Sequence, residues 1–362
     1  MKKTLLTICL VWMCFSLSAQ KIIDLSGKWS FSIDRQDNGE KEKWFSHTLN
    51  DFINLPGSMP EKLKGDEVTA KTQWTGSLYD SSYYYNPYME KYRKEGNIKF
   101  PFFLTPDKHY VGAAWYQKEV NIPADWKGER ILLFLERPHI ETTVWVNGQK
   151  TGMQNSLCVP HQYDITHYVR PGKCTITIRV DNRIKEINVG PDSHSITDQT
   201  QGNWNGIVGR ICLQTTPKTY FDDIQIYPEP EQKLARVKVV IKGTGTAKVK
   251  LSAESFNTDK KHIVPAIQQE IKLNKGVTET EMVLPMGNDM LLWDEFHPAL
   301  YKLKAEVTNG KKTEIKEIQF GMRRFEIKGK WFYVNGRKTQ LRGTVENCDF
   351  PLTGYAPMDV ES

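Results

Sequence analysis

Short runs of alternating apolar and polar residues dominate this chain, and they constrain its fold more than any other feature of the sequence. Such runs include AAWYQKEVNI (113–122), CTITIRVDN (174–182) and RICLQTT (210–216). Alternation is typical of a strand that buries one face, because successive side chains of a strand point to opposite sides. Long stretches with helical periodicity are almost absent. The sequence therefore predicts an all-β fold.

Turn signals separate these runs. Asn147-Gly148 in VWVNGQK and Asn335-Gly336 in FYVNGRK each stand between two apolar runs. Both central residues of a type I′ turn need a positive φ, which asparagine and glycine tolerate best. The two pairs therefore predict two-residue hairpins.

The strands fall into two groups. From Asp24 to Pro228 we expect one large antiparallel sandwich of jelly-roll type. The proline-bearing segment YPEPEQ (227–232) is expected to act as a linker. Six short runs follow, from ARVKVVIKG to TEIKEIQFG, and their regular turns suggest a smaller sandwich of immunoglobulin type.

A tyrosine-rich insertion interrupts the first group. It runs from Thr75 to Gly112 without a clear period, and five tyrosines lie between Tyr79 and Tyr88. One interpretation is a long loop that packs on the sandwich through its own aromatic rings. The other is the rim of a sugar site, since aromatic faces stack on sugar rings and long ordered loops are often functional.

The first nineteen residues have the pattern of a secretory signal peptide. Lys2 and Lys3 precede an apolar run, and small residues follow it up to Ala19. The run is too short for a membrane anchor, which needs about 20 apolar residues. No later segment is apolar enough to span a bilayer, so we expect export to the periplasm or the extracellular space.

Charge and cysteine content exclude several classes. The formal net charge is +6, but the basic residues are scattered, so a nucleic-acid partner is not expected. Four cysteines lie beyond the signal segment, and their spacing fits no zinc motif. We expect Cys174 and Cys212 to be small buried core residues rather than a disulfide. The chain also lacks a phosphate loop and a Ser/His/Asp pattern, and we expect neither a metal nor a cofactor.

Several motifs occur in an order that resembles glycoside hydrolase family 2, which includes β-galactosidases, β-glucuronidases and β-mannosidases. They are AAWYQKEVNIPADWKGERILLFLERPHIETTVWVNGQKTG, PHQYDITHYVRPGKCTITIRVDN, NWNGIVGRICLQTTPKTYFDDIQIYP, LLWDEFHPALYKLKAEV and FGMRRFEIKGKWFYVNGRKTQLRG. The likeness covers nearly the whole chain after residue 19. After the signal peptide expected at 1–19, it implies a sugar-binding jelly roll at 20–228, an immunoglobulin-like sandwich at 229–325 and the start of a (β/α)8 barrel at 326–362.

The resemblance also implies what the chain does not contain. Family members continue from LRG into the barrel, whose strands carry the two catalytic glutamates of a retaining mechanism. This sequence ends about twenty residues after Gly343. We therefore expect no catalytic residue in it and expect the chain by itself to be inactive.

The loop SHSITDQTQGNWNGIVG (193–209) holds the first candidate sugar contacts. In family members the equivalent loop contributes polar groups to the substrate's terminal sugar, and this implies Asp198, Gln201, Asn203 and Trp204 as substrate-binding residues. The alternatives are that the polar residues only shape a turn and that Trp204 anchors the core. Because the loop is polar, contains glycine and is flanked by strands, we expect its side chains to lie outside the core.

The stretch RGTVENCDFPLTG (342–354) holds the second set. It resembles a family segment that faces the sugar, which implies Asn347 and Asp349 as substrate contacts. Asn347 stands where β-galactosidases have histidine, and its amide presents a different donor geometry. The departure puts galactose specificity in doubt.

Three hypotheses follow. The leading one is that this is the exported N-terminal accessory region of a retaining exo-glycosidase, with a carbohydrate substrate and a missing or separately encoded barrel as its partners. A stand-alone carbohydrate-binding module would need a complete site, for which the tyrosine-rich insertion is the candidate. The third hypothesis is an interaction subunit of a split glycosidase. The oligomeric state stays open.

Overall fold

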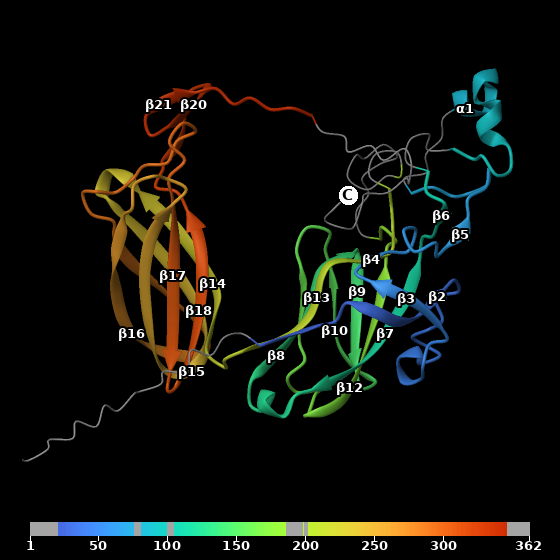
Figure 1. Ribbon diagram of the computed structural model, residues 1–362, viewed down its shortest axis with the longest axis horizontal. Helices are drawn as coiled ribbons and strands as arrows, with labels where there is room; N and C mark the ends of the chain where they lie inside the picture. The colour runs from blue at the N-terminus through green and yellow to red at the C-terminus, as the bar shows by residue number, and fades with distance from the viewer. Residues whose placement is uncertain (1–20, 76–80, 100–104, 186–197, 199–201, 346–362) are drawn as a thin grey trace, which may run out of the picture. The chain divides into compact units, whose positions relative to one another are not determined.

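The computed structural model describes residues 21–75, 81–99, 105–185, 198 and 202–345 (Figure 1). Within these residues Lys21–Thr216 form one compact unit and Pro217–Arg342 form a second. Both are built from antiparallel strand pairs, and the predicted all-β architecture of two successive sandwiches is confirmed.

The first unit is a sandwich of two sheets. One sheet contains, in spatial order, β1 (Ile22–Asp24), β13 (Gly206–Thr216), β8 (Arg130–His139) and β11 (His161–Asp164), with β4 (Gly57–Ser58) beside β13. The other contains β10 (Gln149–Asn155), β9 (Glu141–Val146), β12 (Gly172–Asp181), β7 (Ala113–Ile122), β2 (Gly27–Asp34) and β3 (Asp51–Leu55). A small pair, β5 (Asp66–Glu67) and β6 (Lys108–His109), stands apart from both sheets. The short helices of this unit are η1 (Trp44–Ser46), α1 (Ser81–Tyr85), η2 (Pro87–Arg93) and η3 (Ala124–Trp126).

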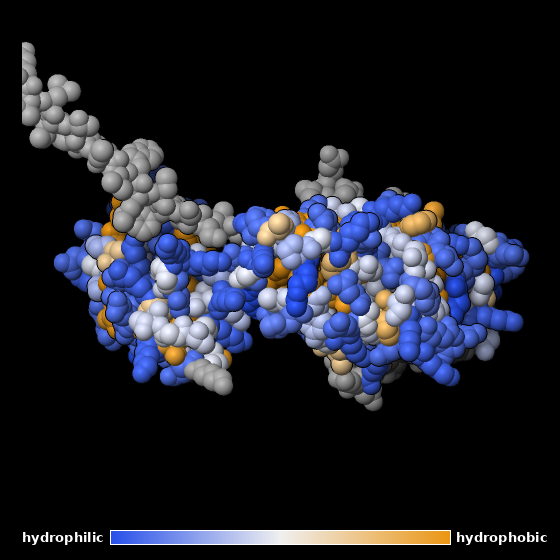
Figure 2. Space-filling view, turned by 90° about the horizontal axis from the view of Figure 1, so that it is seen from below, coloured by the Kyte–Doolittle hydropathy of each residue, from blue (hydrophilic) through white to orange (hydrophobic). Residues whose placement is uncertain are grey.

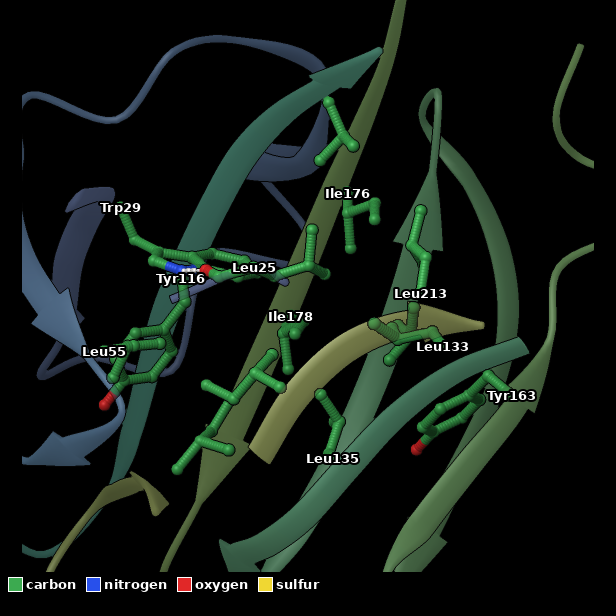
Figure 3. Packing of buried hydrophobic residues seen from close by; sticks show 14 of the residues in the cluster. Leu25, Trp29, Leu55, Tyr116, Leu133, Leu135, Tyr163, Ile176, Ile178 and Leu213 are labelled. Carbon is green, nitrogen blue, oxygen red and sulfur yellow. Dashed lines mark hydrogen bonds between the residues drawn. The ribbon is translucent and has the colours of Figure 1, made fainter. Parts of the chain in front are cut away.

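The core of this unit comes from the alternation read in the sequence. Ile176 and Ile178 of β12 point inward, and Leu133 and Leu135 of β8 meet them from the other sheet (Figure 3). Each such side chain contributes roughly 1.5–3 kcal/mol when fully removed from water. Trp29 is also buried, and its indole N–H is satisfied by the carbonyl of Leu25 at 2.8 Å.

The Asn-Gly turns are confirmed. Asn147 and Gly148 have φ values of 50° and 76°, and Asn335 and Gly336 have values of 49° and 77°. The residues that flank each pair are register partners, β9 with β10 in the first hairpin and β20 with β21 in the second.

The second unit contains a sandwich and a small sheet. The sandwich strands are β14 (Tyr220–Glu229), β15 (Leu234–Phe256), β16 (Ile263–Pro285), β17 (Leu300–Asn309) and β18 (Lys312–Phe320), with η4 (Pro230–Gln232) between β14 and β15. The small sheet is formed by β19 (Phe325–Lys328), β20 (Trp331–Val334) and β21 (Arg337–Thr339). A separate apolar core fills the sandwich.

The boundary between the units lies earlier than the sequence suggested. Residues 220–229, which were expected to close the jelly roll, form β14 and pair with β15 of the second sandwich. Phe221 is buried in the second core, and Ile224 and Ile226 pack against it. The segment YPEPEQ is therefore the end of a strand and a short helix rather than a linker. Pro228 is tolerated because β14 is paired on one side only.

Two strands of the second sandwich are longer than expected. The runs ARVKVVIKG and AKVKLSAES were expected to be separate strands, but they form the single strand β15, which pairs with β16 along most of its length. The expected turn is instead a shift of register between Gly243 and Gly245. A bulge of this kind bends a strand without ending it. As a result, β15 pairs with β14 before the bulge and with β17 after it.

Cys174 and Cys212 are buried and unbridged, as predicted. No helix in the described ranges is both long enough and apolar enough to cross a bilayer. Hydrophilic side chains predominate on the face shown in Figure 2, and the hydrophobic ones are scattered over it.

Candidate functional site

The site candidate lies where the chain enters β13. Gly206 pairs with Ser58 of β4 on one side and with His139 of β8 on the other. A Cβ atom at Gly206 would lie 2.4 Å from the carbonyl oxygen of Gly57, so glycine is needed for this close approach. The loop before Gly206 is therefore fixed at its end by two strands.

Asn205 joins this loop to the sheet that contains β7 and β12. Its amide nitrogen donates to the carbonyls of Gly112 and Val180, each at 2.9 Å. Its amide oxygen accepts a hydrogen bond of 2.7 Å from the hydroxyl of Tyr116. Burial raises the pKa of Tyr116 well above its ordinary value, so the phenol stays protonated and donates.

Asp198 is buried rather than exposed to a ligand. Its side chain accepts hydrogen bonds from the backbone N–H of Asn203 at 2.7 Å and from that of Thr75 at 2.5 Å. Nε2 of His109 lies 3.4 Å from Oδ2 of the same carboxylate. Trp74 packs its ring edgewise against His109, with centroids 4.7 Å apart. Asp198 thus ties the loop to the two ends of the tyrosine-rich insertion.

Asn203 continues the same network. Its amide nitrogen donates to Oγ1 of Thr75 at 2.9 Å and to the carbonyl of Asn182 at 3.0 Å. The amide of Asn182 in turn holds the backbone of Tyr110 and Gly112. Two buried atoms of this cluster lack a hydrogen-bond partner, Oδ1 of Asn203 and Nε2 of His109.

Trp204 is partly buried and keeps part of its surface accessible. Its ring stacks on His139 with centroids 4.5 Å apart and an angle of 21° between the planes. Nδ1 of His139 donates to the backbone carbonyl of Trp204 at 2.7 Å. Burial lowers the pKa of His139 to about 4, although this hydrogen bond favours the protonated ring.

An ion cluster lies beside the network, at the end of β12. Burial by itself would raise the pKa of Asp181, but hydrogen bonds from Arg183 and Lys185 outweigh it and hold that pKa well below its ordinary value. Arg179 also contacts the carboxylate, at 3.0 Å. The cluster comprises Asp37, Glu141, Arg179, Asp181, Arg183 and Lys185. It fixes the direction in which the chain leaves β12.

The structure therefore corrects one expectation about the loop. Its side chains were expected to lie outside the core, but Asp198 is 3% exposed and Asn203 is 5% exposed. Both are buried because segments distant in sequence, at Thr75 and Asn182, cover them and satisfy their polar atoms. Trp204 lies at the edge of the same cluster. Gln201, Asn347 and Asp349 lie outside the described residues.

Sequence reasoning missed the residues that complete this network. They are Thr75, His109, Asn182 and Asn205. Only Asn205 had a signal in the sequence, since it stands in NWNG directly before a predicted strand. Within the described residues, no group of three or more His, Cys, Asp or Glu side chains is arranged to hold a metal ion.

We expect Asn205→Ala to destabilise the protein strongly. The change removes two donors and leaves the buried Tyr116 hydroxyl without its acceptor, and a buried unsatisfied polar group costs about 1–3 kcal/mol. The free energy of unfolding, measured by urea denaturation, should fall by about 2–3 kcal/mol. Asn121→Ala, at an exposed position of β7, is the matched control and should change it by less than about 0.5 kcal/mol. Equal effects of the two substitutions would contradict the role given to Asn205.

We also expect His139 to make stability depend on pH. An unfolded histidine titrates at about 6.5, so between about pH 6.5 and pH 4 the unfolded chain binds a proton that the folded protein does not. Stability should therefore fall as the pH is lowered through this window. In His139→Phe, which keeps a ring against Trp204 but cannot titrate, the fall should be smaller. His161, whose pKa burial also lowers, is present in both proteins, and its contribution cancels. Parallel stability curves from denaturation at a series of pH values would exclude this role.

Comparison with known proteins identifies both units. Residues 22–217 match the family model described as "Glycosyl hydrolases family 2, sugar binding domain", and residues 219–323 match "Glycosyl hydrolases family 2". The two matches meet where the structure divides the chain.

Similar proteins carry the names of two glycosidases. A β-glucuronidase from Paenibacillus borealis is 23% identical over 355 residues, which cover 92% of this chain and 51% of that protein. Human β-glucuronidase is 23% identical, with coverage of 91% and 49%. A β-galactosidase from Thermoanaerobacter pseudethanolicus is 25% identical, with coverage of 73% and 35%. The chain spans about half the length, or less, of the curated relatives it matches.

Solved structures give the same fold. The β-glucuronidase from Ruminococcus gnavus, solved in complex with D-glucuronic acid, aligns with a TM-score of 0.61 and 19% identity over 90% of this chain and 50% of that one. The two family matches together cover nearly all the residues that form the two sandwiches. This chain belongs to glycosyl hydrolases family 2.

Proposed function

We propose that this chain is the sugar-binding and scaffold region of an exported, retaining exo-glycosidase that degrades carbohydrate. The observation that carries the proposal is the cluster of Asp198, Asn203 and Trp204 at one end of a sandwich that matches the family's sugar-binding domain. In this proposal Trp204 offers a ring face to the sugar. Asp198 and Asn203 hold the loop in place beneath it. Gln201, Asn347 and Asp349 stay predicted sugar contacts.

The chemistry itself is assigned to another part of the enzyme. Retaining hydrolysis needs two carboxyl groups about 5–5.5 Å apart, and the acid of the pair has a raised pKa. Each aspartate or glutamate with a clear pKa shift in the described residues has its pKa lowered, as Asp164, Asp181 and Glu326 illustrate. Such groups stay ionised and cannot donate a proton to a leaving group near neutral pH. We therefore place the catalytic pair in a (β/α)8 barrel, the chain's proposed partner.

An exposed apolar face on the small sheet supports the scaffold role. Phe325 and Ile327 of β19 are 47% and 68% exposed, and Phe296 beside the sheet is 68% exposed. Arg337 of β21 lies 4.8 Å from the centre of the Phe296 ring, which connects that ring to the sheet. A three-stranded sheet with one such face gains stability when another element covers it. The face is suited to pack against the barrel.

The relatives' names suggest substrates without deciding between them. Those proteins are named β-glucuronidases and β-galactosidases, so we propose that the complete enzyme hydrolyses an O-glycosidic bond to a sugar of this general kind. A stand-alone carbohydrate-binding module and a subunit of a split glycosidase stay alternatives. The first would bind sugar without a barrel, and the second would associate with a separate barrel chain.

We expect residues 20–362 alone to release no product from aryl β-glucuronide, β-galactoside or β-mannoside. Joining them to the barrel of a close family member should restore hydrolysis of one of the three. In that active protein Trp204→Ala should lower kcat/KM at least 10-fold, equivalent to about 1.4 kcal/mol. Trp44→Ala removes another partly buried tryptophan of the same unit and is the matched control. Turnover by the unjoined chain, or equal losses in the two variants, would argue against the proposed role.

The proposal of export is supported by the signal pattern at residues 1–19, which lie outside the described residues. We propose that the mature protein begins near Gln20. N-terminal sequencing of protein recovered outside the cytoplasm should find this start, and an intact Met1 there would rule it out.

A further inference from the structure

The described residues of the tyrosine-rich insertion form an excursion that contains two short helices, α1 and η2, and the strand β6. It leaves the sandwich through the β5–β6 pair and carries α1 and η2 beyond that pair (Figure 1). Thr75 and His109, at its two ends, are the residues that contact Asp198. The excursion is therefore anchored at its base by the buried network described above.

Polar contacts also fix the tip of the excursion. The buried Tyr83 donates through its hydroxyl to the carbonyl of Tyr92 at 2.8 Å, and the guanidinium of Arg93 donates back to the carbonyl of Tyr83. The side chain of Asn86 caps η2 by accepting from the N–H of Tyr88 at 2.9 Å. α1 and η2 are thereby held against each other, which sets the direction of the side chains they carry.

These contacts leave neighbouring tyrosines facing water. Tyr85 is 78% exposed and Tyr88 is 84% exposed, and Tyr84 is 39% exposed, whereas Tyr83 is 4% exposed. Isolated exposed aromatic residues are common, but here three lie within five positions of an internally bonded segment. Met89 and Ile98, the aliphatic residues between positions 81 and 99, are partly buried. The accessible apolar area therefore consists mainly of phenol rings.

Phenol rings suit sugars better than they suit an aliphatic partner. Their flat faces can cover the C–H face of a pyranose ring, and their hydroxyl groups can exchange hydrogen bonds with sugar hydroxyls. Few rotatable bonds lie between such a ring and the backbone, so little side-chain entropy is lost on binding.

The charges beside the rings favour an acidic ligand. Residues 87–99 contain four basic side chains, Lys91, Arg93, Lys94 and Lys99, and two acidic ones, Glu90 and Glu95. Lys94 faces Glu90 at 3.4 Å, whereas the ammonium of Lys91 lies over the ring of Tyr92, 4.8 Å from its centre. Lys91 is exposed and follows Tyr88 by three positions, and its ammonium can pair with a carboxylate on a ligand that stacks on the tyrosine rings.

We propose that Tyr84, Tyr85 and Tyr88, with Lys91, form a binding surface for an acidic polysaccharide, a chain whose rings carry uronate carboxylates. The inference rests on the proposed function for its choice of carbohydrate as the ligand class, and it adds a site and a ligand charge. The surface holds a polymeric substrate through several weak ring contacts, and no covalent step takes place there.

The test uses affinity electrophoresis of residues 20–362 in gels that contain polygalacturonate, with neutral dextran as the reference polymer. We expect the protein to be retarded by polygalacturonate much more than by dextran. In Tyr85→Ala/Tyr88→Ala the association constant should fall about tenfold, because two ring contacts are lost. Lys91→Gln should weaken binding to polygalacturonate and reduce its dependence on salt.

The double tyrosine variant separates this surface from general attraction between a basic protein and a polyanion. The formal charge of +6 for the full chain becomes +4 for residues 20–362, because Lys2 and Lys3 are absent, and the double variant keeps every charge. Tyr227→Ala is the matched control, since Tyr227 is a 47% exposed tyrosine of the second unit. It should bind as the unmodified protein does.

Three results would overturn the proposal. They are absence of retardation in polygalacturonate, equal retardation by dextran, and unchanged binding of the double tyrosine variant. None of them depends on hydrolysis, so the outcome is separate from that of the barrel-joining experiment. Loss of activity there with intact polymer binding here would count against the proposed function and leave the surface supported.

Discussion

The amide of Asn205 is the contact on which the first sandwich and its candidate site both depend. Asn205 stands directly before β13 of one sheet, and its side chain reaches residues in and beside β7 and β12 of the other sheet. Asn205 supplies donors to Gly112 and Val180 and accepts from Tyr116, while its own carbonyl accepts from Met59. The side chain therefore joins the segment before β7, β7 itself and β12, and the backbone carbonyl adds the segment after β4. A buried amide is stable only when its groups are paired, which fixes the position of the loop before β13.

This constraint gives the polar residues of that loop a structural role. Asp198 and Asn203 have the chemistry of sugar contacts, yet their hydrogen-bonding groups serve mainly to hold Thr75 and Asn182. Trp204, by contrast, keeps part of its surface accessible. The network thus supports a site more than it forms one. It also connects the loop to the base of the tyrosine-rich excursion through His109, so the two regions that we propose as carbohydrate contacts share one buried anchor.

The second unit combines a bent strand pair with a small sheet that has an exposed apolar face. Its long β15–β16 pair is bent by a register shift at Gly243, and this lets one hairpin contribute to both faces of a small sandwich. The core is complete, since Tyr301, Leu303 and Ala305 are fully buried. The small sheet β19–β21 instead leaves phenylalanine and isoleucine exposed. The sandwich core is thus buried, whereas the small sheet has an apolar face that another element can cover. This arrangement suits the scaffold role proposed for the unit, in which that face packs against the barrel.

The sequence by itself determined the all-β class, the two Asn-Gly hairpins and the buried state of Cys174 and Cys212, because alternation and turn chemistry are local properties. The family resemblance rested on the order of such motifs. Only the tertiary structure decided that β14 belongs to the second unit, that β15 is continuous, and that Asp198 and Asn203 are buried. Those outcomes depend on partners far away in the chain. The carboxylate of Asp198 is covered by residues 123 positions earlier in the sequence, and no local pattern around it encodes that contact.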